Sequence, residues 1–402
     1  MTKEWINDRI QYHNDILNFF KDKPNNLFIV NIGKYNWQNE LLKFIGKPTT
    51  DKIPELESLN EFLPRLLSRP DEEYVNNAIH RLYLIGVLDI RDKVGKITLL
   101  GHECLRYMRE LKRIENAVSV INSYNFNASY EVIDAVALLE ITEGSLDKLF
   151  SKPRIKDKNS PEAKEKMDDF NKKRKFLASA SGDHITAYKI LNKYREKKFG
   201  TPYPRRDDEL KPQNSDDASK WIKENYLNNK KIKKALDMSK KLNNLIGRSI
   251  SFYRREHPNA NKVIFRETKP RVSDKIEENI IASFLSGYVF NTAKKSNKDY
   301  KTCFPQIQTY AQLDRFSLFN EFYGKKLPSY GIYYSYDSRD GRQRINGFSK
   351  LFPSVIPTIG EVKDDKLIKC MSDREQNKPV KKNKSINKKK SLKKKGKKKR
   401  KR

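Results

Sequence analysis

The sequence predicts a mostly α-helical protein with a small β-barrel and a basic tail, and three observations predict it. Apolar residues recur at helical spacing over much of residues 74–250. They alternate with polar residues, at the two-residue period of a strand, in residues 331–336 and 344–348. Residues 378–402 hold sixteen Lys or Arg and no acidic residue. Such a segment cannot bury a core, so we expect it to be disordered.

The charge of the chain predicts a polyanionic partner. The formal net charge is +33, of which +17 remains when residues 378–402 are set aside. Nucleic acid is the commonest polyanion for such a surface, whereas no amphipathic helix adjoins the tail to insert into a membrane. The whole chain has 37% hydrophobic and 11% aromatic residues, so it is too apolar for wholesale disorder. Its 402 residues are enough for two or three domains.

No sequence feature predicts a cofactor, a metal centre or export. The three cysteines, Cys104, Cys303 and Cys370, stand far apart, and His102 with Cys104 lacks a second pair at metal-site spacing. There is no run of eighteen apolar residues and the N-terminus is polar, which predicts a soluble intracellular protein. The basic tail is also typical of a nuclear localisation signal. The excess of Lys, Asn and Ile suggests an AT-rich genome, such as that of a virus or a protist.

The N-terminal part of the chain is predicted to be helices interrupted by short strands. Residues 5–20 have helical spacing, and residues 27–32 are typical of a buried strand. A helix that starts near Tyr74 ends at Gly86. Residues 87–100 then favour two short strands, and helices continue over residues 103–150.

Two charged segments that contain prolines are predicted to be exposed loops, residues 151–176 and 197–219. Between them a helix starts at Gly182-Asp183-His184, where Asp183 offers a capping oxygen. Residues 221–245 favour a helix pair whose apolar positions alternate with lysines. These lysines form either a solvated face or contacts with phosphates.

Residues 280–352 are predicted to hold the barrel, which begins with residues 280–290. Tyrosines interleave with cations there. Aromatic rings stack on bases and cations neutralise phosphates, and an OB-type barrel uses this combination on single strands. The alternative is that most of these tyrosines are core residues. The cations are Lys294, Lys295, Lys298, Lys301, Arg339, Arg342 and Arg344.

Three segments, in this order, resemble the C-terminal half of DEAH-box RNA helicases. Gly182-Asp183-His184, with the apolar-aromatic helix after it and the Trp-led helix at residues 221–227, resembles that family's ratchet domain. Residues 74–101 resemble its winged helix, and residues 280–348 resemble its small β-barrel. The resemblance implies five parts. Residues 1–50 are an N-terminal segment of uncertain type, residues 51–102 a winged-helix-like domain and residues 103–250 a helical ratchet (HA2-like). Residues 275–352 form an OB-fold-like barrel, and residues 353–402 are the disordered tail.

The resemblance also implies where RNA binds. In that family the ratchet closes one side of the RNA channel and the motor domains close the other. An arginine usually stands where this chain has Lys230 or Lys231, so a cation is kept while the bidentate geometry of arginine is lost. We therefore expect no catalytic residue and seven residues that bind RNA: His184, Lys189, Lys230, Lys231, Lys294, Lys295 and Arg342.

The sequence lacks the chemistry of a motor. A nucleotide-hydrolysing loop needs G-x-x-x-x-G-K-[ST], and the residue after each Gly-Lys pair is Tyr35, Pro48, Ile97, Lys326 or Lys398. We expect an RNA-binding protein related to the C-terminal region of DEAH-box RNA helicases, without its own ATPase motor. Two alternatives stay open: a subunit that completes a helicase with a separate motor subunit, and a packaging protein that binds nucleic acid through its tail.

Overall fold

The computed structural model describes residues 78–79, 81–89, 96–153, 160–201, 215–256, 265, 275–297, 299–302, 310–314, 317–319, 327–339 and 342–355. The predictions for residues 1–50 and for the tail lie outside these residues. In the part that is described, no helix is long and apolar enough to cross a membrane.

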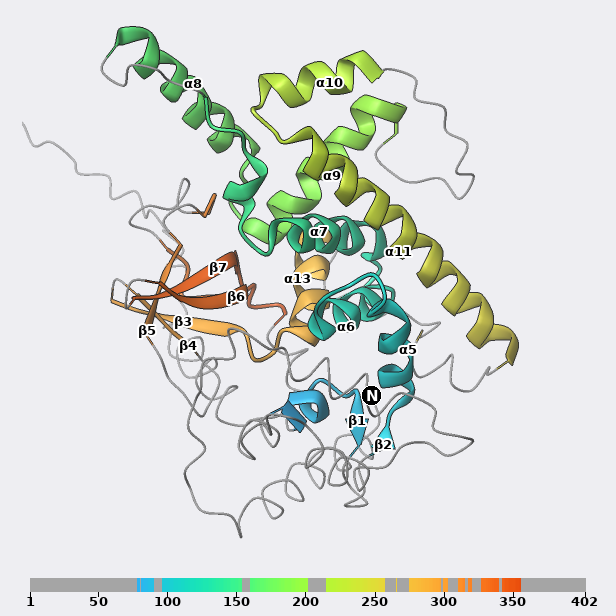
Figure 1. The fold of residues 1–402 in the computed structure, drawn as a ribbon. Helices are drawn as coiled ribbons and strands as arrows, with labels where there is room; N and C mark the ends of the chain where they lie inside the picture. Colours follow the sequence, from blue (N-terminus) through green and yellow to red (C-terminus); the bar gives the residue numbers. More distant parts are fainter. Residues whose placement is uncertain are drawn as a thin grey trace, which may run out of the picture.

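Helices make up most of the described structure, and one small closed barrel follows them (Figure 1). This confirms the predicted mostly α fold class with a small barrel. The helical part contains β1 (Leu88–Asp89), β2 (Lys96–Ile97), α5 (Leu99–Tyr107), α6 (Ile114–Ser123), α7 (Ser129–Thr142), the 3-10 helix η2 (Leu146–Leu149), α8 (Pro161–Leu177), α9 (Asp183–Phe199), α10 (Ser215–Glu224), α11 (Asn229–Glu256) and α13 (Ile276–Gly287).

The barrel closes through strands in the order β3-β4-β5-β7-β6. All its pairings are antiparallel except β5 with β7, and β6 pairs with β3 to close the ring. Ala293, Tyr300, Phe319 and Phe348 are among the buried side chains that fill it. The strands are β3 (Thr292–Ser296), β4 (Asp299–Thr302), β5 (Tyr310–Leu313), β6 (Tyr330–Arg339) and β7 (Arg342–Lys350).

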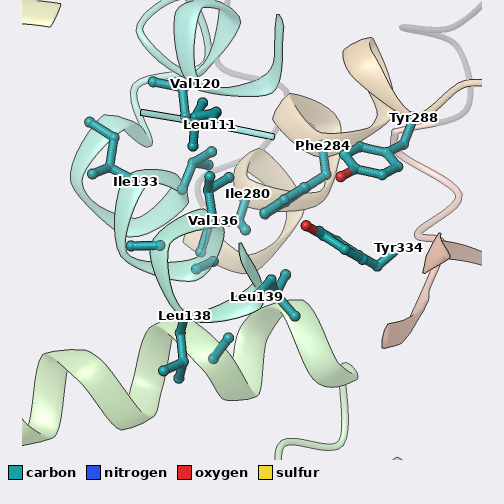
Figure 2. Close-up of a cluster of buried hydrophobic side chains, with 14 of the residues drawn as sticks. Leu111, Val120, Ile133, Val136, Leu138, Leu139, Ile280, Phe284, Tyr288 and Tyr334 are labelled. Carbon is teal, nitrogen blue, oxygen red and sulfur yellow. The ribbon is translucent and has the colours of Figure 1, made fainter. Parts of the chain in front are cut away.

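The main core forms around α7, which is buried along nearly its whole length. A helix that is apolar on all sides is stable only when other elements surround it, and α6, α9, α11 and α13 all pack against α7. Figure 2 shows Val136 and Leu139 of α7 beside Ile280 and Phe284 of α13. The predicted helices over residues 103–150 are therefore confirmed as core.

A buried ion pair links three of these helices. Arg195 of α9 donates from Nη2 to Asp134 Oδ1 of α7 over 2.6 Å and to Ser239 Oγ of α11 over 3.1 Å. All three side chains are buried. Because a buried charge without partners is costly, this network fixes the relative positions of α7, α9 and α11.

The predicted loop over residues 151–176 is wrong in its second half, where α8 forms. Ser160 caps this helix by accepting a hydrogen bond from the Ala163 amide over 3.1 Å, and Pro161 occupies its first turn. Only Ala163, Phe170 and Arg174 of α8 are buried. The helix is so polar that hydrophobic spacing gives almost no signal, whereas its capping residues do.

The prediction that the barrel begins at residues 280–290 is also wrong. Residues 276–287 form α13, which packs against α6, and the barrel begins at Thr292. Spacing alone does not separate a buried helix from a buried strand when the apolar run is short. The predicted strands around residue 90 are confirmed, because Leu88 pairs with Ile97 and Asp89 with Lys96.

Candidate nucleic-acid interface

The start of α9 docks directly onto the barrel. Gly182 forms an isolated antiparallel bridge with Ser349 of β7, and the Lys350 amide donates to the Ser181 carbonyl over 3.0 Å. Gly182 has φ of 115°, and a Cβ added there would lie 2.3 Å from the Cα of Ser349. Only glycine fits both the backbone conformation and the space.

Asp183 does not cap α9 as predicted. Its carboxylate Oδ2 accepts from Ser317 Oγ over 2.7 Å and from the Phe348 amide over 3.1 Å, so it binds the barrel. Gly182 is the N-cap residue and no side chain caps the helix. Burial raises the pKa of Asp183 to about 6, although these hydrogen bonds oppose the rise.

His184 lies in the junction between α9, α13 and β7 and has no exposed surface. Its amide donates to Ser349 Oγ over 2.9 Å, and its Nδ1 lies 2.8 Å from the same oxygen. The ring packs edge-on against Phe284, with centroids 4.3 Å apart. Burial lowers the pKa of His184 to about 3, so the imidazole is neutral at pH 7. This placement gives His184 a positioning role in the junction.

Lys189 joins α9 to α13. Its Nζ lies 2.6 Å from Glu277 Oε1 and 3.3 Å from Ser179 Oγ, while about half of its side chain stays exposed. Burial alone raises the pKa of Glu277, but hydrogen bonds from Lys189 and Ser181 outweigh burial and hold the pKa below its ordinary value. Lys189 is therefore already neutralised in part by a protein carboxylate.

Lys230 and Lys231 lie in the first turn of α11. Lys230 is exposed, whereas Lys231 donates from Nζ to the Lys148 carbonyl over 2.6 Å. Partial burial and the nearby Lys148 charge lower the pKa of Lys231. Lys230 is the better placed of the two to reach a phosphate in solution.

A row of aromatic and basic residues crosses four strands on the outer face of the barrel. Lys294 of β3 is paired with Tyr330 of β6 on one side and with Lys301 of β4 on the other. Lys301 is paired in turn with Tyr310 of β5. Because directly paired residues point to the same face of a sheet, these four side chains lie side by side. We call Tyr330, Lys294, Lys301 and Tyr310 the outer row.

Distances within the outer row support this arrangement. Lys294 Nζ lies 5.6 Å from the centroid of the Tyr330 ring, and Lys301 Nζ lies 6.0 Å from that of Tyr310. Tyr310 is 56% exposed. The neighbouring residue Ala311 is buried and points into the barrel. The row thus places one exposed ring, that of Tyr310, beside two half-buried lysines, and it ends at Tyr330, which is half-buried because it also packs against the main core.

The structure separates the other barrel residues of the predicted site. Lys295 follows Lys294 in β3, so it points to the opposite face and is paired with the buried Tyr300. Its Nζ donates to the Leu327 carbonyl over 3.5 Å. Arg342 opens β7 opposite Arg339, away from the four paired positions of the row.

The predicted site missed three of the four residues in the outer row. Lys301 and the tyrosines stand in the interleaved segment, but their order along the chain does not show which of them share a face. The pattern Asp299-Tyr300-Lys301-Thr302, with a buried aromatic between polar residues, is the signal that places Lys301 outside. No group of three His, Cys, Asp or Glu that could hold a metal ion is found among the described residues.

Comparison with known proteins places the chain near RNA helicases. No protein-family model matches it. It is 24% identical over 211 residues to the ATP-dependent RNA helicase DHX33 of Homo sapiens. The aligned region covers 52% of this chain and 24% of the relative. It is 26% identical over 166 residues to the protein of the same name from Mus musculus, covering 41% of this chain and 19% of the relative. The match therefore spans about a quarter or less of each relative's length. It supports a coarse relationship of this chain to RNA helicases.

Proposed function

We propose that this chain is a helicase-related RNA-binding protein that holds single-stranded RNA on the outer row of its barrel. The observation that carries the proposal is the pairing of Tyr330, Lys294, Lys301 and Tyr310 across four strands. Successive bases stack on exposed rings, and lysines between the rings neutralise the phosphates. The similarity to proteins named as RNA helicases supports RNA as the partner.

The proposal favours a single strand over a duplex. In duplex RNA the bases are stacked on one another and their faces are not available to tyrosine rings. An unpaired strand exposes those faces. The spacing of lysine and tyrosine in neighbouring strands suits a flexible backbone that crosses the sheet.

The docking of α9 gives the helical part a role in this proposal. Asp183 and His184 bind β7 from the start of α9, so they fix the barrel against the helices that carry Lys189 and Lys230. We propose that these two lysines extend the contact with RNA beyond the barrel. His184 contributes indirectly, by holding the start of α9 against β7. We also propose that the chain contains a winged helix, a helical ratchet and an OB-like barrel, as the resemblance implies.

A separate motor is the second part of the proposal. The given sequence contains no phosphate-binding loop, and the matched relatives are named as ATP-dependent helicases. We propose that this chain binds RNA without hydrolysing ATP and that, where it takes part in unwinding, a motor subunit supplies the hydrolysis.

A titration of fluorescent single-stranded RNA tests the barrel site. We expect the double variant Lys294→Ala/Lys301→Ala to bind more weakly, with a slope of log affinity against log salt that is less steep by about 1.4, since each phosphate contact contributes about 0.7 on a single strand. The control is Lys164→Gln/Lys172→Gln, which removes two exposed charges from α8. Equal slopes for the barrel variant and this control would remove the outer row from the interface.

A further inference from the structure

An open hollow with a volume of about 550 Å³ lies between the end of α5 and one face of α11. Its lining from α11 is Lys241, Asn244, Leu245 and Arg248, which follow the spacing of a single helix face. Arg106, Arg109 and Glu110 line it from the other side. We call this feature the basic hollow, because four of its seven lining residues are cations.

Two of the four cations are held by protein carboxylates. Lys241 Nζ lies 3.0 Å from Glu110 Oε2, and Arg106 Nη1 lies 3.3 Å from Oε2 of the buried Glu103. The Arg106 guanidinium also lies 5.5 Å from the centroid of the Phe252 ring. Arg106 is thus fixed in place before any ligand arrives.

The other two cations are available to a ligand. Arg109 and Arg248 are exposed, and neither forms an ion pair with any residue that the structure describes. A planar guanidinium binds phosphate oxygens in a bidentate manner. These two arginines face one hollow, and among the described residues no carboxylate neutralises their charge, so it is available to an anion.

The hollow is remote from the outer row. In Figure 1 the barrel lies at one side of the helices, whereas α5 and the lower end of α11 lie at the other, with α6 and α13 between them. A strand bound to the barrel therefore does not enter the hollow unless it passes around the helical body. The hollow is a second site and not an extension of the first.

We propose that the basic hollow binds the phosphodiester backbone of single-stranded RNA. Its open shape suits a polymer that passes through, and the two exposed arginines, Arg109 and Arg248, suit successive phosphates. Phe252 beside Arg106 is 36% exposed and offers a ring on which a base can stack. A carboxylate-rich peptide would bring charge but no base for that ring. The inference rests on the proposed function, since it assigns a second contact to the same RNA.

The test uses the full chain and a fluorescent single-stranded RNA, titrated at several salt concentrations. The variant Arg109→Gln/Arg248→Gln removes the two exposed arginine charges of the hollow, and we expect the slope of log affinity against log salt to become less steep by about 1.4. The variant Arg109→Lys/Arg248→Lys keeps the charges, so its slope should match that of the parent chain. The control is again Lys164→Gln/Lys172→Gln.

Three outcomes decide the proposal. A flatter slope for the Gln variant alone, with the Lys variant unchanged, supports it. A Gln variant that matches the α8 control overturns it. Binding of a fluorescent oligoglutamate that is lost in the Gln variant, while the RNA slope is unchanged, also overturns it and assigns the hollow to an acidic protein segment.

The barrel variant Lys294→Ala/Lys301→Ala, titrated in parallel, separates the two proposals. If it binds RNA like the control while the Gln variant has a flatter slope, the barrel site fails and the hollow stands alone. If only the barrel variant has a flatter slope, the hollow fails and the barrel site stands. All substituted side chains of the Gln variant are exposed, so its thermal unfolding midpoint should equal that of the parent chain.

Discussion

Gly182 and Ser349 pair as an isolated bridge at the point where α9 meets strand β7. The two residues are far apart in the sequence, yet their backbones approach so closely that no side chain fits on residue 182. The residues after Gly182 then bind the barrel through Asp183 and His184. A short motif thus joins the helical part of the protein to its barrel.

Replacing Gly182 by alanine tests this junction. The φ of 115° is unfavourable for alanine, and its Cβ would overlap Ser349. We expect the free energy of unfolding to fall by at least about 1–3 kcal/mol, measured by urea denaturation. Gly247→Ala in α11 is the matched control, because nothing lies within 4 Å of its added Cβ. The control should be neutral or stabilising by up to about 1 kcal/mol. Equal losses in both variants would show that the contact with Ser349 does not require glycine at residue 182.

The buried pair Asp183 and His184 predicts two opposite effects of pH on stability. The pKa of His184 is lowered from 6.5 to about 3 on folding, so its contribution is present above pH 6.5 and is lost as the pH falls towards 3. The pKa of Asp183 is raised from 3.8 to about 6, so its contribution is present below pH 3.8 and is lost as the pH rises through 6.

Two variants separate these contributions. Between pH 7 and pH 4.5, His184→Gln should lose less stability on acidification than the parent chain, since the unfolded state no longer gains that proton. Asp183→Asn should lose more, because the folded state no longer gains one. Chemical denaturation at each pH measures both. Parallel stability curves for the three proteins would show that neither group titrates differently on folding.

Purified protein should show no ATP hydrolysis above buffer, with or without RNA. The sequence offers no loop that could hold the phosphates and the magnesium ion of a nucleotide. A phosphate-release assay measures this. Hydrolysis by the protein alone, abolished by a single substitution in this chain, would reveal a nucleotide site without the phosphate-loop motif.

Much of the helical core could be predicted from the sequence, because apolar spacing reports burial directly. Val132, Val136 and Leu139 of α7 illustrate this, and all three are buried. The α8 helix was missed because its stability depends on Ser160, Pro161 and a few contacts, not on an apolar face. The apolar run of α13 is short, and spacing alone does not distinguish such a buried helix from a buried strand.

The candidate site was harder to predict because it depends on pairing between segments. Lys294 and Lys295 are neighbours in the sequence, but the pleat of β3 sends them to opposite faces. The basic hollow joins Arg109, which follows α5, to Arg248 of α11, and no spacing rule connects these two positions. An aspartate before a helix is typical of a capping acceptor, so the sequence predicts a cap at Asp183. It does not show that Ser317 and the Phe348 amide, which are distant in the chain, donate to this carboxylate.

The most direct test of the central claim is photo-crosslinking of the full chain to a single-stranded RNA that carries 4-thiouridine, followed by identification of the crosslinked peptides. We expect crosslinks in the peptides that contain Tyr310 and Tyr330. These crosslinks should be lost in the double variant Tyr310→Ala/Tyr330→Ala but kept in Tyr130→Ala, which removes an exposed tyrosine outside the barrel. Crosslinks that are absent from the barrel strands and confined to residues 378–402 would contradict the claim that the outer row binds RNA.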